Sequence, residues 1–362
     1  MEVLLCFAAV LFLAYANGAN DNAKPVATLE GASVLGPKGA LALATGAALA
    51  GGLLAVFWGE ALARRFQGAG IVPAELTREP RFLFAVAASA ASTVFVASRT
   101  GLPVSTTHAL LGALAGAALG RVGGALGTGA LVSGMVAPLL LSPVLAFALC
   151  GGVFFSLRPL AARFGGREEC LCVVETPVPL GAGPAPAARS SLLLHRGAGE
   201  ECRQAGWPGI SVPFDSCLRA LHVLSAAAVG VARSLNDTPK IAGLLLGLGG
   251  ASSWQLFLPV ILAVCVGGWL RSAPVARTMS RRITPMDESQ ALSANLATAF
   301  LVLWASRLGL PVSTTHTACG SLFAVAALRG DGSKRWVSGV AWAWLATAPV
   351  AGALAYVLVS LR

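Results

Sequence analysis

Two short polar stretches place the same chemical groups at matched positions of the chain. They hold Asn20, Asp21 and Lys24 in the first case and Asn236, Asp237 and Lys240, 216 residues later, in the second. The aspartate and asparagine offer oxygen ligands for Na⁺, and the carboxylate can also take up a proton. A lysine three residues after an aspartate can meet it on one helix face. Each stretch therefore predicts an Asp–Lys ion pair and a station for a cation.

A second pair of matched stretches carries a cluster of hydroxyl groups. Ala97–His108 reads ASRTGLPVSTTH and Ala305–His316 reads ASRLGLPVSTTH, with eleven of twelve positions identical at an offset of 208. Proline followed by Ser and Thr favours a helix start, and a helix start binds anions through its free N–H groups. Two such starts facing each other would bind a tetrahedral oxyanion from both sides. The hydroxyl donors are Ser105, Thr106, Thr107, Ser313, Thr314 and Thr315.

Matched histidines and arginines flank these hydroxyls. His108 and His316 could carry protons or contact the anion, although a histidine in the first turn of a helix more often packs or caps. Arg99 and Arg307 could reach the anion, but we favour the interpretation that they extend to the membrane interface.

The composition requires that the elements positioning these residues lie in a membrane. Hydrophobic residues make up 56% of the 362 residues, charged residues only 12%, and the mean hydropathy is +0.74. A soluble domain carries about 25% charged residues. The arginines form short clusters without an interleaved aromatic stripe, so they suit topology signals and exclude a nucleic-acid partner. The apolar run at Glu2–Ala19 lacks a basic start, which favours a first membrane helix over a cleaved signal peptide.

The hydropathy pattern predicts an all-α polytopic membrane protein with about 10–12 membrane segments, some of them broken or re-entrant. A first membrane repeat (1–157) and a second (217–362) flank a hydrophilic linker (158–216). The second Asn–Asp stretch is expected to separate two apolar runs, Cys217–Ala232 and Ile241–Gly250. Glycines four residues apart predict close helix packing; they are Gly112, Gly116 and Gly120.

The linker also holds Cys170, Cys172 and Cys202, with His195 nearby. A single C-x-C pair is a weak zinc signal, so a metal site, a disulfide and free thiols all stay open.

Duplicated membrane halves with polar, Gly/Pro-broken segments are typical of secondary transporters, whose substrate site lies between the repeats. The chain has no GK[ST] sequence, so a Walker-type ATP site is absent and an ion gradient must drive transport. A Ser105–His108 hydrolase is disfavoured because nucleophiles are not normally duplicated. We therefore expect no enzyme activity, and an anion channel is the remoter alternative.

Both repeated motifs resemble those of a known family, the inorganic phosphate transporters of the PiT type, which also includes sulfate permeases. Asn17–Asp21 is similar to the start of the family's GANDVANA signature, and GLPVSTTH is similar to its second motif. The resemblance implies two inverted repeats, a central phosphate site, coupling to Na⁺ or H⁺, and a cytoplasmic linker.

The sequence departs from the family pattern where the pattern has its second asparagine. Lys24 and Lys240 stand there, and a fixed ammonium could take the place of Na⁺. We therefore expect a phosphate symporter driven by H⁺ rather than Na⁺. A permease for sulfate or another oxyanion is the alternative, although Asp21 and Asp237 favour a substrate that still carries a proton.

The expected setting is a multi-pass protein of a plasma or inner membrane. The expected partners are inorganic phosphate and the lipid bilayer, with a second copy of the chain as a candidate for a homodimer. No cofactor is expected beyond the co-transported H⁺ or Na⁺.

Overall fold

The computed structural model describes residues 1–68, 71–123, 127–164, 169–180, 187–198, 211–249 and 253–361. The first part of the chain forms α1 (Glu2–Asp21), α2 (Ala23–Gly31), α3 (Pro37–Trp58), α4 (Glu60–Phe66), η1 (Leu76–Arg78), α5 (Pro80–Thr100), α6 (Thr106–Val122), α7 (Thr128–Leu131), η2 (Val132–Val136) and α8 (Ala137–Phe164). The strands β1 (Glu169–Leu180), β2 (Ala187–Ala198) and β3 (Ser211–Pro213) follow. The last part forms α10 (Phe214–Leu246), α11 (Ser253–Arg271), α12 (Ala273–Arg277), η3 (Thr278–Ile283), α13 (Glu288–Arg307), α14 (Thr314–Arg329) and α15 (Lys334–Ser360).

Seven stretches of helix among the described residues are long and apolar enough to cross a membrane. They are α1 with α2, and α3, α5, α8, α10, α11 and α15. The helices α6, α13 and α14 complete the bundle, being either shorter or more polar. The chain is therefore an integral multi-pass membrane protein with an all-helical membrane part, as predicted.

The two Asn–Asp stretches differ in backbone structure. The first lies at a break, since α1 ends at Asp21 and α2 begins at Ala23. The second lies within the continuous helix α10. The prediction that the two apolar runs are separate membrane segments is therefore wrong, because they form one candidate span. Pro239 lies inside this helix, next to Gly59, where a Cβ atom would meet the proline ring at 2.5 Å. Buried packing of this kind lets membrane helices tolerate proline.

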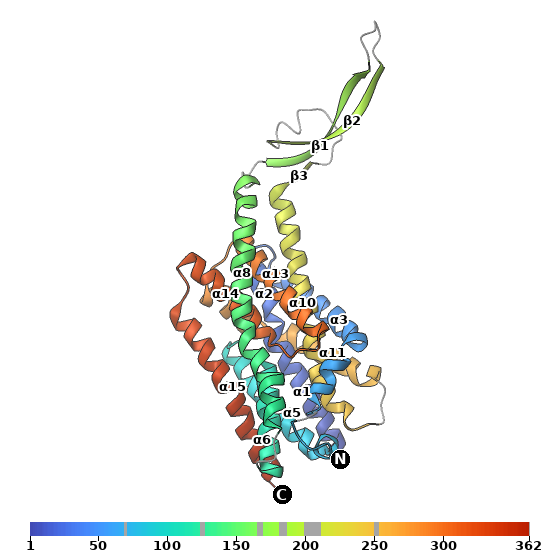
Figure 1. The fold of residues 1–362 in the computed structure, drawn as a ribbon, viewed down its shortest axis with the longest axis vertical. Helices are drawn as coiled ribbons and strands as arrows, with labels where there is room; N and C mark the ends of the chain where they lie inside the picture. The colour runs from blue at the N-terminus through green and yellow to red at the C-terminus, as the bar shows by residue number, and fades with distance from the viewer. Residues whose placement is uncertain are drawn as a thin grey trace.

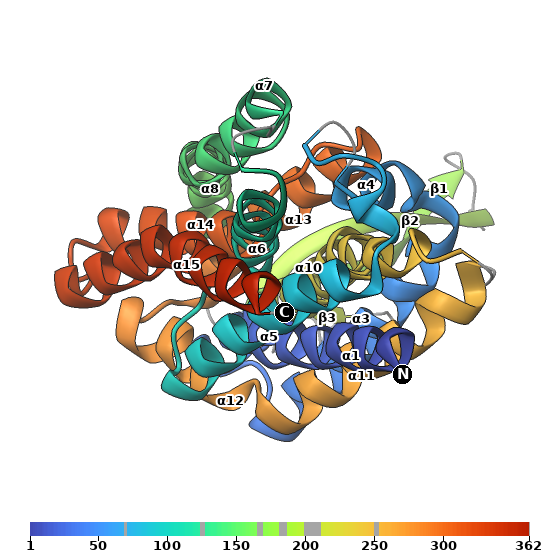
Figure 2. The same ribbon diagram turned by 90° about the horizontal axis from the view of Figure 1, so that it is seen from below.

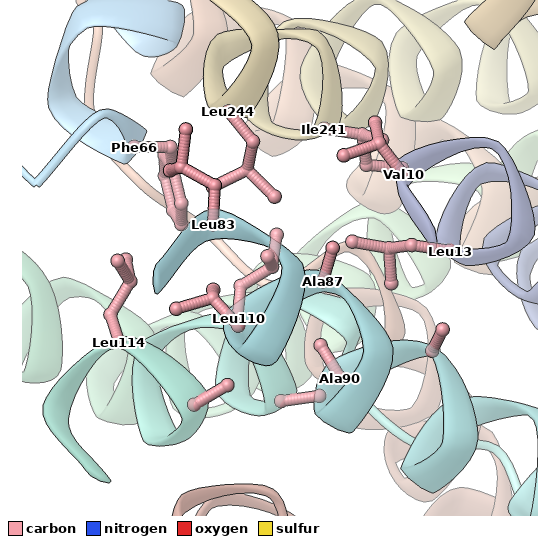
Figure 3. Packing of buried hydrophobic residues seen from close by; sticks show 14 of the residues in the cluster. Val10, Leu13, Phe66, Leu83, Ala87, Ala90, Leu110, Leu114, Ile241 and Leu244 are labelled. Carbon is pink, nitrogen blue, oxygen red and sulfur yellow. The ribbon is translucent and has the colours of Figure 1, made fainter. Parts of the chain in front are cut away.

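The largest hydrophobic core joins helices of both halves. Leu13 of α1, Leu83 of α5, Leu110 of α6 and Leu244 of α10 all belong to it and are almost completely buried (Figure 3). Phe66 of α4 closes one side of the same cluster. Because this cluster contacts the helices that carry the polar motifs, it fixes where those motifs lie.

Helices of one half pack mainly against helices of the other. The helix α6 packs against α15, and Figure 2 shows the two side by side; correspondingly, α14 packs against α8. The helix α3 packs against α10, and α11 against α1. The predicted close packing is confirmed, because a Cβ atom at Gly112 or Gly116 would overlap a carbonyl oxygen of α15.

The described part of the predicted linker forms a sheet with strand order β2-β1-β3, which the all-helical prediction did not include. The strands β1 and β2 pair antiparallel over their whole length. This sheet lies beyond the ends of α8 and α10, at one end of the helical bundle (Figure 1). The strands are thus outside the membrane part.

Candidate functional site

The two STTH motifs (Ser105–His108 and Ser313–His316) meet at the centre of the molecule. The hydroxyl of Thr315 donates to the carbonyl oxygen of Val104 at 2.8 Å, which joins the second motif to the first. The rings of His108 and His316 lie with their centroids 4.4 Å apart. The two predicted helix starts are therefore brought together.

Each start is built by a serine cap. The Ser105 side chain accepts from the backbone N–H of His108, and Ser313 accepts from that of His316, both at 3.1 Å. The helices α6 and α14 begin directly after these serines. Pro103 and Pro311 lie two residues before the cap, outside the helices, rather than at their first helical position. The hydroxyls of Ser105 and Ser313 are thus engaged by their own helices.

The first Asp–Lys pair, Asp21 and Lys24, is buried at this centre. Lys24 Nζ lies 2.7 Å from Asp21 Oδ2, and both side chains are 1% exposed. Lys24 also donates to Thr314 Oγ1 at 2.8 Å. Thr315 Oγ1 lies 3.3 Å from Asp21 Oδ1, so its one hydrogen can serve this carboxylate in place of the Val104 carbonyl. The first pair is therefore held by hydroxyls of the second STTH motif.

The second Asp–Lys pair, Asp237 and Lys240, is equally buried. Lys240 Nζ lies 3.2 Å from Asp237 Oδ1 and donates to Thr107 Oγ1 at 2.9 Å. It also donates to the carbonyl oxygen of Val312 at 2.8 Å and to Asn236 Oδ1. Four oxygens thus surround one ammonium group, those of a carboxylate, a side-chain amide, a hydroxyl and a backbone carbonyl. The predicted i, i+3 pairing is present in both halves.

Thr314 links the two carboxylates. Its hydroxyl oxygen lies 3.1 Å from Asp21 Oδ2 and 3.1 Å from Asp237 Oδ2. A hydroxyl group has one hydrogen and can donate to only one acceptor at a time. The two aspartates of the two halves are therefore neighbours across a single hydroxyl.

The matched asparagines fix the approach to the helix starts. Asn20 Nδ2 donates to Ser98 Oγ at 3.1 Å, and Asn236 Nδ2 donates to Ser306 Oγ at 2.8 Å. The serines are themselves matched positions of the longer repeat. Asn20 Oδ1 also accepts from the backbone N–H of Val104 at 3.2 Å. Asn20 thus holds the backbone before α6, whereas Asn236 contacts the side chain of Ser306 at the end of α13.

The two histidines lie on the side of the STTH motifs toward α15. The His316 ring is 3.9 Å from the ring of Trp344, whose indole donates to the carbonyl oxygen of Pro103 at 3.1 Å. His108 Nδ1 lies 2.9 Å from Ser105 Oγ, whereas neither ring nitrogen of His316 has a hydrogen-bond partner among the described residues. Both rings line an otherwise apolar cavity of about 380 Å³. Packing accounts for most of their contacts.

The matched arginines lie outside this centre. Arg99 is exposed and its guanidinium lies over the ring of Phe95, 5.8 Å from the centroid. Arg307 is exposed and lines a cavity of about 490 Å³ together with Ser306. The structure does not bring either arginine to the Asp–Lys pairs, and both positions suit the interface interpretation.

The structure does not test the predictions made for the linker cysteines. Cys170 and Cys172 lie on β1, where the structure describes only the backbone, and Cys202 lies outside the described residues. Within the described ranges, no group of three or more His, Cys, Asp or Glu side chains could hold a metal ion.

Two site residues escaped the sequence analysis. Asn17 Nδ2 donates to Asp21 Oδ2 at 3.2 Å and to Thr106 Oγ1 at 3.1 Å. Arg233 is 1% exposed and donates to Asn17 Oδ1 at 3.5 Å and to Asn22 Oδ1 at 3.2 Å. Arg233 and Asn17 differ by 216, the offset of the Asn–Asp stretches, and this register could have identified both.

A bundle of apolar helices with charged and hydroxyl groups buried at its centre is the arrangement of a multi-pass membrane protein with an internal polar site. Residues 17–355 match the Phosphate transporter family. The chain belongs to this family, whose members are transporters and not enzymes.

Individual proteins show the same likeness. The chain is 27% identical over 359 residues to a Rhizobium meliloti protein named "probable low-affinity inorganic phosphate transporter", covering 95% of this chain and 91% of the relative. It is 36% identical over 146 residues to the human sodium-dependent phosphate transporter 2, covering 36% of this chain and 22% of that protein.

A solved structure titled "The sodium-dependent phosphate transporter" superposes with a TM-score of 0.76 at 18% identity. The match covers 99% of this chain and 98% of that one. This likeness establishes the fold.

Proposed function

We propose that this protein is a secondary transporter that carries inorganic phosphate across a membrane together with cations, and that the coupled cation is H⁺. Family membership and the relatives named as phosphate transporters support the substrate. The observation that carries the coupling is the buried ammonium of Lys240, enclosed by oxygens of both halves.

The surroundings of Lys240 are those that a sodium ion would require. A carboxylate, an amide oxygen, a hydroxyl and a backbone carbonyl face the ammonium. In transporters, such oxygens and carbonyls coordinate Na⁺. The Lys240 ammonium is covalently fixed and occupies the space between these four oxygens. Na⁺ therefore has no place to bind there. The charge that Na⁺ would bring is built into the chain.

The neighbouring carboxylates supply a station for protons. Asp21 and Asp237 both lie 3.1 Å from the Thr314 hydroxyl, and Lys24 donates to the same oxygen. The hydroxyl hydrogen satisfies one carboxylate, so a proton on the other carboxyl can be donated to the hydroxyl oxygen. The arrangement thus suits one additional proton shared between the two halves.

The membrane potential sets a minimum for the coupling. Moving one charge against 100 mV requires about 2.3 kcal/mol, so a phosphate dianion requires roughly 4.6 kcal/mol. Two accompanying cations cancel this penalty, and a third lets the potential drive uptake. The proton shared by Asp21 and Asp237 would be one of these cations.

The buried carboxylates also favour phosphate over sulfate. Phosphate keeps a proton near neutral pH and can donate it to an aspartate, whereas sulfate has none and would be repelled. A buried acceptor discriminates strongly against a ligand that lacks the donor. We therefore expect excess sulfate to compete only weakly with labelled phosphate.

Uptake of labelled phosphate into proteoliposomes tests this proposal. We expect accumulation under an inward proton gradient without Na⁺, and little stimulation by an added Na⁺ gradient. Lys240→Asn restores the residue of the family pattern and removes the ammonium from between its four oxygen partners. Uptake by this variant should therefore gain stimulation by Na⁺. Arg64→Gln removes an exposed charge, 71% accessible in its pair with Glu60, and serves as the control. Uptake that collapses without Na⁺ and ignores the pH gradient would contradict proton coupling.

A further inference from the structure

Arg233 is a buried, permanently charged side chain of α10. It is 1% exposed and stands among the largest fully buried side chains of the described residues. Its guanidinium crosses from the second half to the first, where it donates to Asn17 Oδ1 at 3.5 Å and Asn22 Oδ1 at 3.2 Å. The first distance is at the outer limit for a hydrogen bond. Two amide oxygens are thus its acceptors.

The guanidinium lacks a partner of opposite charge. Among the described residues no ion pair includes Arg233, and its Nε atom has no hydrogen-bond partner. Asp237 follows four residues later, a spacing that permits pairing on a helix. That carboxylate instead pairs with Lys240 and accepts from Thr314. A free N–H group remains, and the nearby carboxylates Asp21 and Asp237 already pair with lysines.

The charges of the site leave this arginine in excess. Each Asp–Lys pair is neutral in itself, since every carboxylate has its own ammonium. Arg233 therefore gives the buried centre one net positive charge. An isolated buried charge is strongly unfavourable, and a bound anion would compensate it.

Arg233 is connected to the hydroxyl cluster through one amide. Asn17 accepts from Arg233 with its oxygen and donates with its nitrogen to Thr106 Oγ1. The guanidinium and the start of α6 thus lie on either side of a single side chain. An oxyanion that displaces the buried Asn17 amide would contact both and replace the weak 3.5 Å contact.

We propose that Arg233 is a substrate-binding residue, which donates its free N–H groups to the oxyanion held at the STTH motifs and supplies the charge that retains it. This proposal rests on the proposed function, because it assumes that the solute is an oxyanion. The guanidinium is suited to the role because its planar group of N–H donors binds phosphate oxygens in pairs.

The test compares Arg233→Asn, which introduces the residue found at the matched position 17, with Arg233→Lys and with the exposed control Arg64→Gln. The full-length proteins are purified and reconstituted, and KM and Vmax are measured for phosphate uptake. Stabilisation of each protein by phosphate in thermal unfolding reports binding independently of turnover.

We expect Arg233→Asn to raise KM by about 10- to 100-fold, the range for losing a charged hydrogen bond, and to abolish stabilisation by phosphate. Arg233→Lys keeps the charge and should raise KM less, and Arg64→Gln should behave as the wild type. An unchanged KM in Arg233→Asn, or a loss of Vmax alone, would show that Arg233 only supports the break after α1.

The outcome also separates this proposal from the proposed function. Wild-type protein that takes up no phosphate under any gradient contradicts phosphate transport. In that case, stabilisation of the wild type by phosphate or sulfate that is lost in Arg233→Asn still supports the arginine as an oxyanion ligand. Stabilisation retained in that variant overturns it.

Discussion

At the scale of single residues, the site is nearly symmetric without being identical in its two halves. Lys24 reaches Thr314, whereas Lys240 reaches Thr107, which is not the matched threonine. Thr106, the match of Thr314, is occupied by the Asn17 amide. The position matched to Asn17 holds Arg233, which turns away to the first half. One changed residue therefore makes the two Asp–Lys pairs inequivalent.

Removing one partner of the second Asp–Lys pair should be worse than removing both. Asp237→Asn leaves a buried ammonium without its carboxylate, and breaking a buried pair destabilises by about 3–5 kcal/mol. The double variant Asp237→Asn with Lys240→Met leaves no charge there and should recover most of this loss. Thermal unfolding in detergent measures both variants.

Uptake separates stability from transport in the same proteins. Both variants should lose concentrative uptake, because each lacks the carboxylate that would carry a proton. Equal destabilisation by the single and double variants would mean that the pair is not energetically coupled. Retained uptake in Asp237→Asn would remove Asp237 from the transport site.

The repeated motifs predicted the Asp–Lys pairs because the partners lie three residues apart, within α10 in the second half and across the short break between α1 and α2 in the first. The motifs alone did not mark Asn17 or Arg233 as members of the site, although the offset of 216 relates the two positions. Their contacts cross between the halves, and only the packing of α10 against α1 and α2 determines which side chains meet. The same reason explains why Arg99 and Arg307, although matched, lie outside.

At the scale of elements, the site depends on helices that begin in the interior. The residue after α5 is Gly101 with φ +76°, and the chain after α13 turns at Gly309 with φ +64°. Only glycine adopts this conformation without strain. These turns send the chain back toward the centre, where Ser105 and Ser313 start α6 and α14.

Hydropathy alone could not locate the backbone breaks. The same Asn–Asp–Lys chemistry interrupts the helix after Asp21 yet continues through α10. Composition indicates that polar residues are buried but leaves open whether their backbone is helical, since tertiary packing decides it.

Because α6 and α15 are in close contact at Gly116, adding one methyl group there should destabilise the fold. Gly116→Ala should destabilise the protein by about 1–3 kcal/mol, because the new Cβ would overlap the carbonyl oxygen of Gly352. Gly46→Ala in α3 is the matched control, since nothing lies within 4 Å of its Cβ position. Thermal unfolding that ranks the two variants equally would contradict the packing.

At the scale of the whole molecule, the helices of each half pack against helices of the other half. The helix α8 runs toward the end that carries the β-sheet, whereas its counterpart α15 runs away from that end to the C-terminus (Figure 1). Opposite directions of matched helices support the prediction that the halves are inverted copies.

Impermeant cysteine labelling tests the inversion. Arg121 and Arg329 are matched by the offset of 208 and end α6 and α14. In a background without native cysteines, Arg121→Cys and Arg329→Cys should be labelled from opposite sides of the membrane. Labelling of both from one side would exclude inverted copies.

Because helices of the first half pack against helices of the second, the order of synthesis limits when the fold can form. When the ribosome has completed α8, this helix still lacks α13 and α14, against which it packs. The site formed by the Asp–Lys pairs and the two STTH motifs cannot form before α14 is inserted. A chain that ends before α14 therefore leaves Asp21 and Lys24 without the hydroxyl partner that Thr314 supplies.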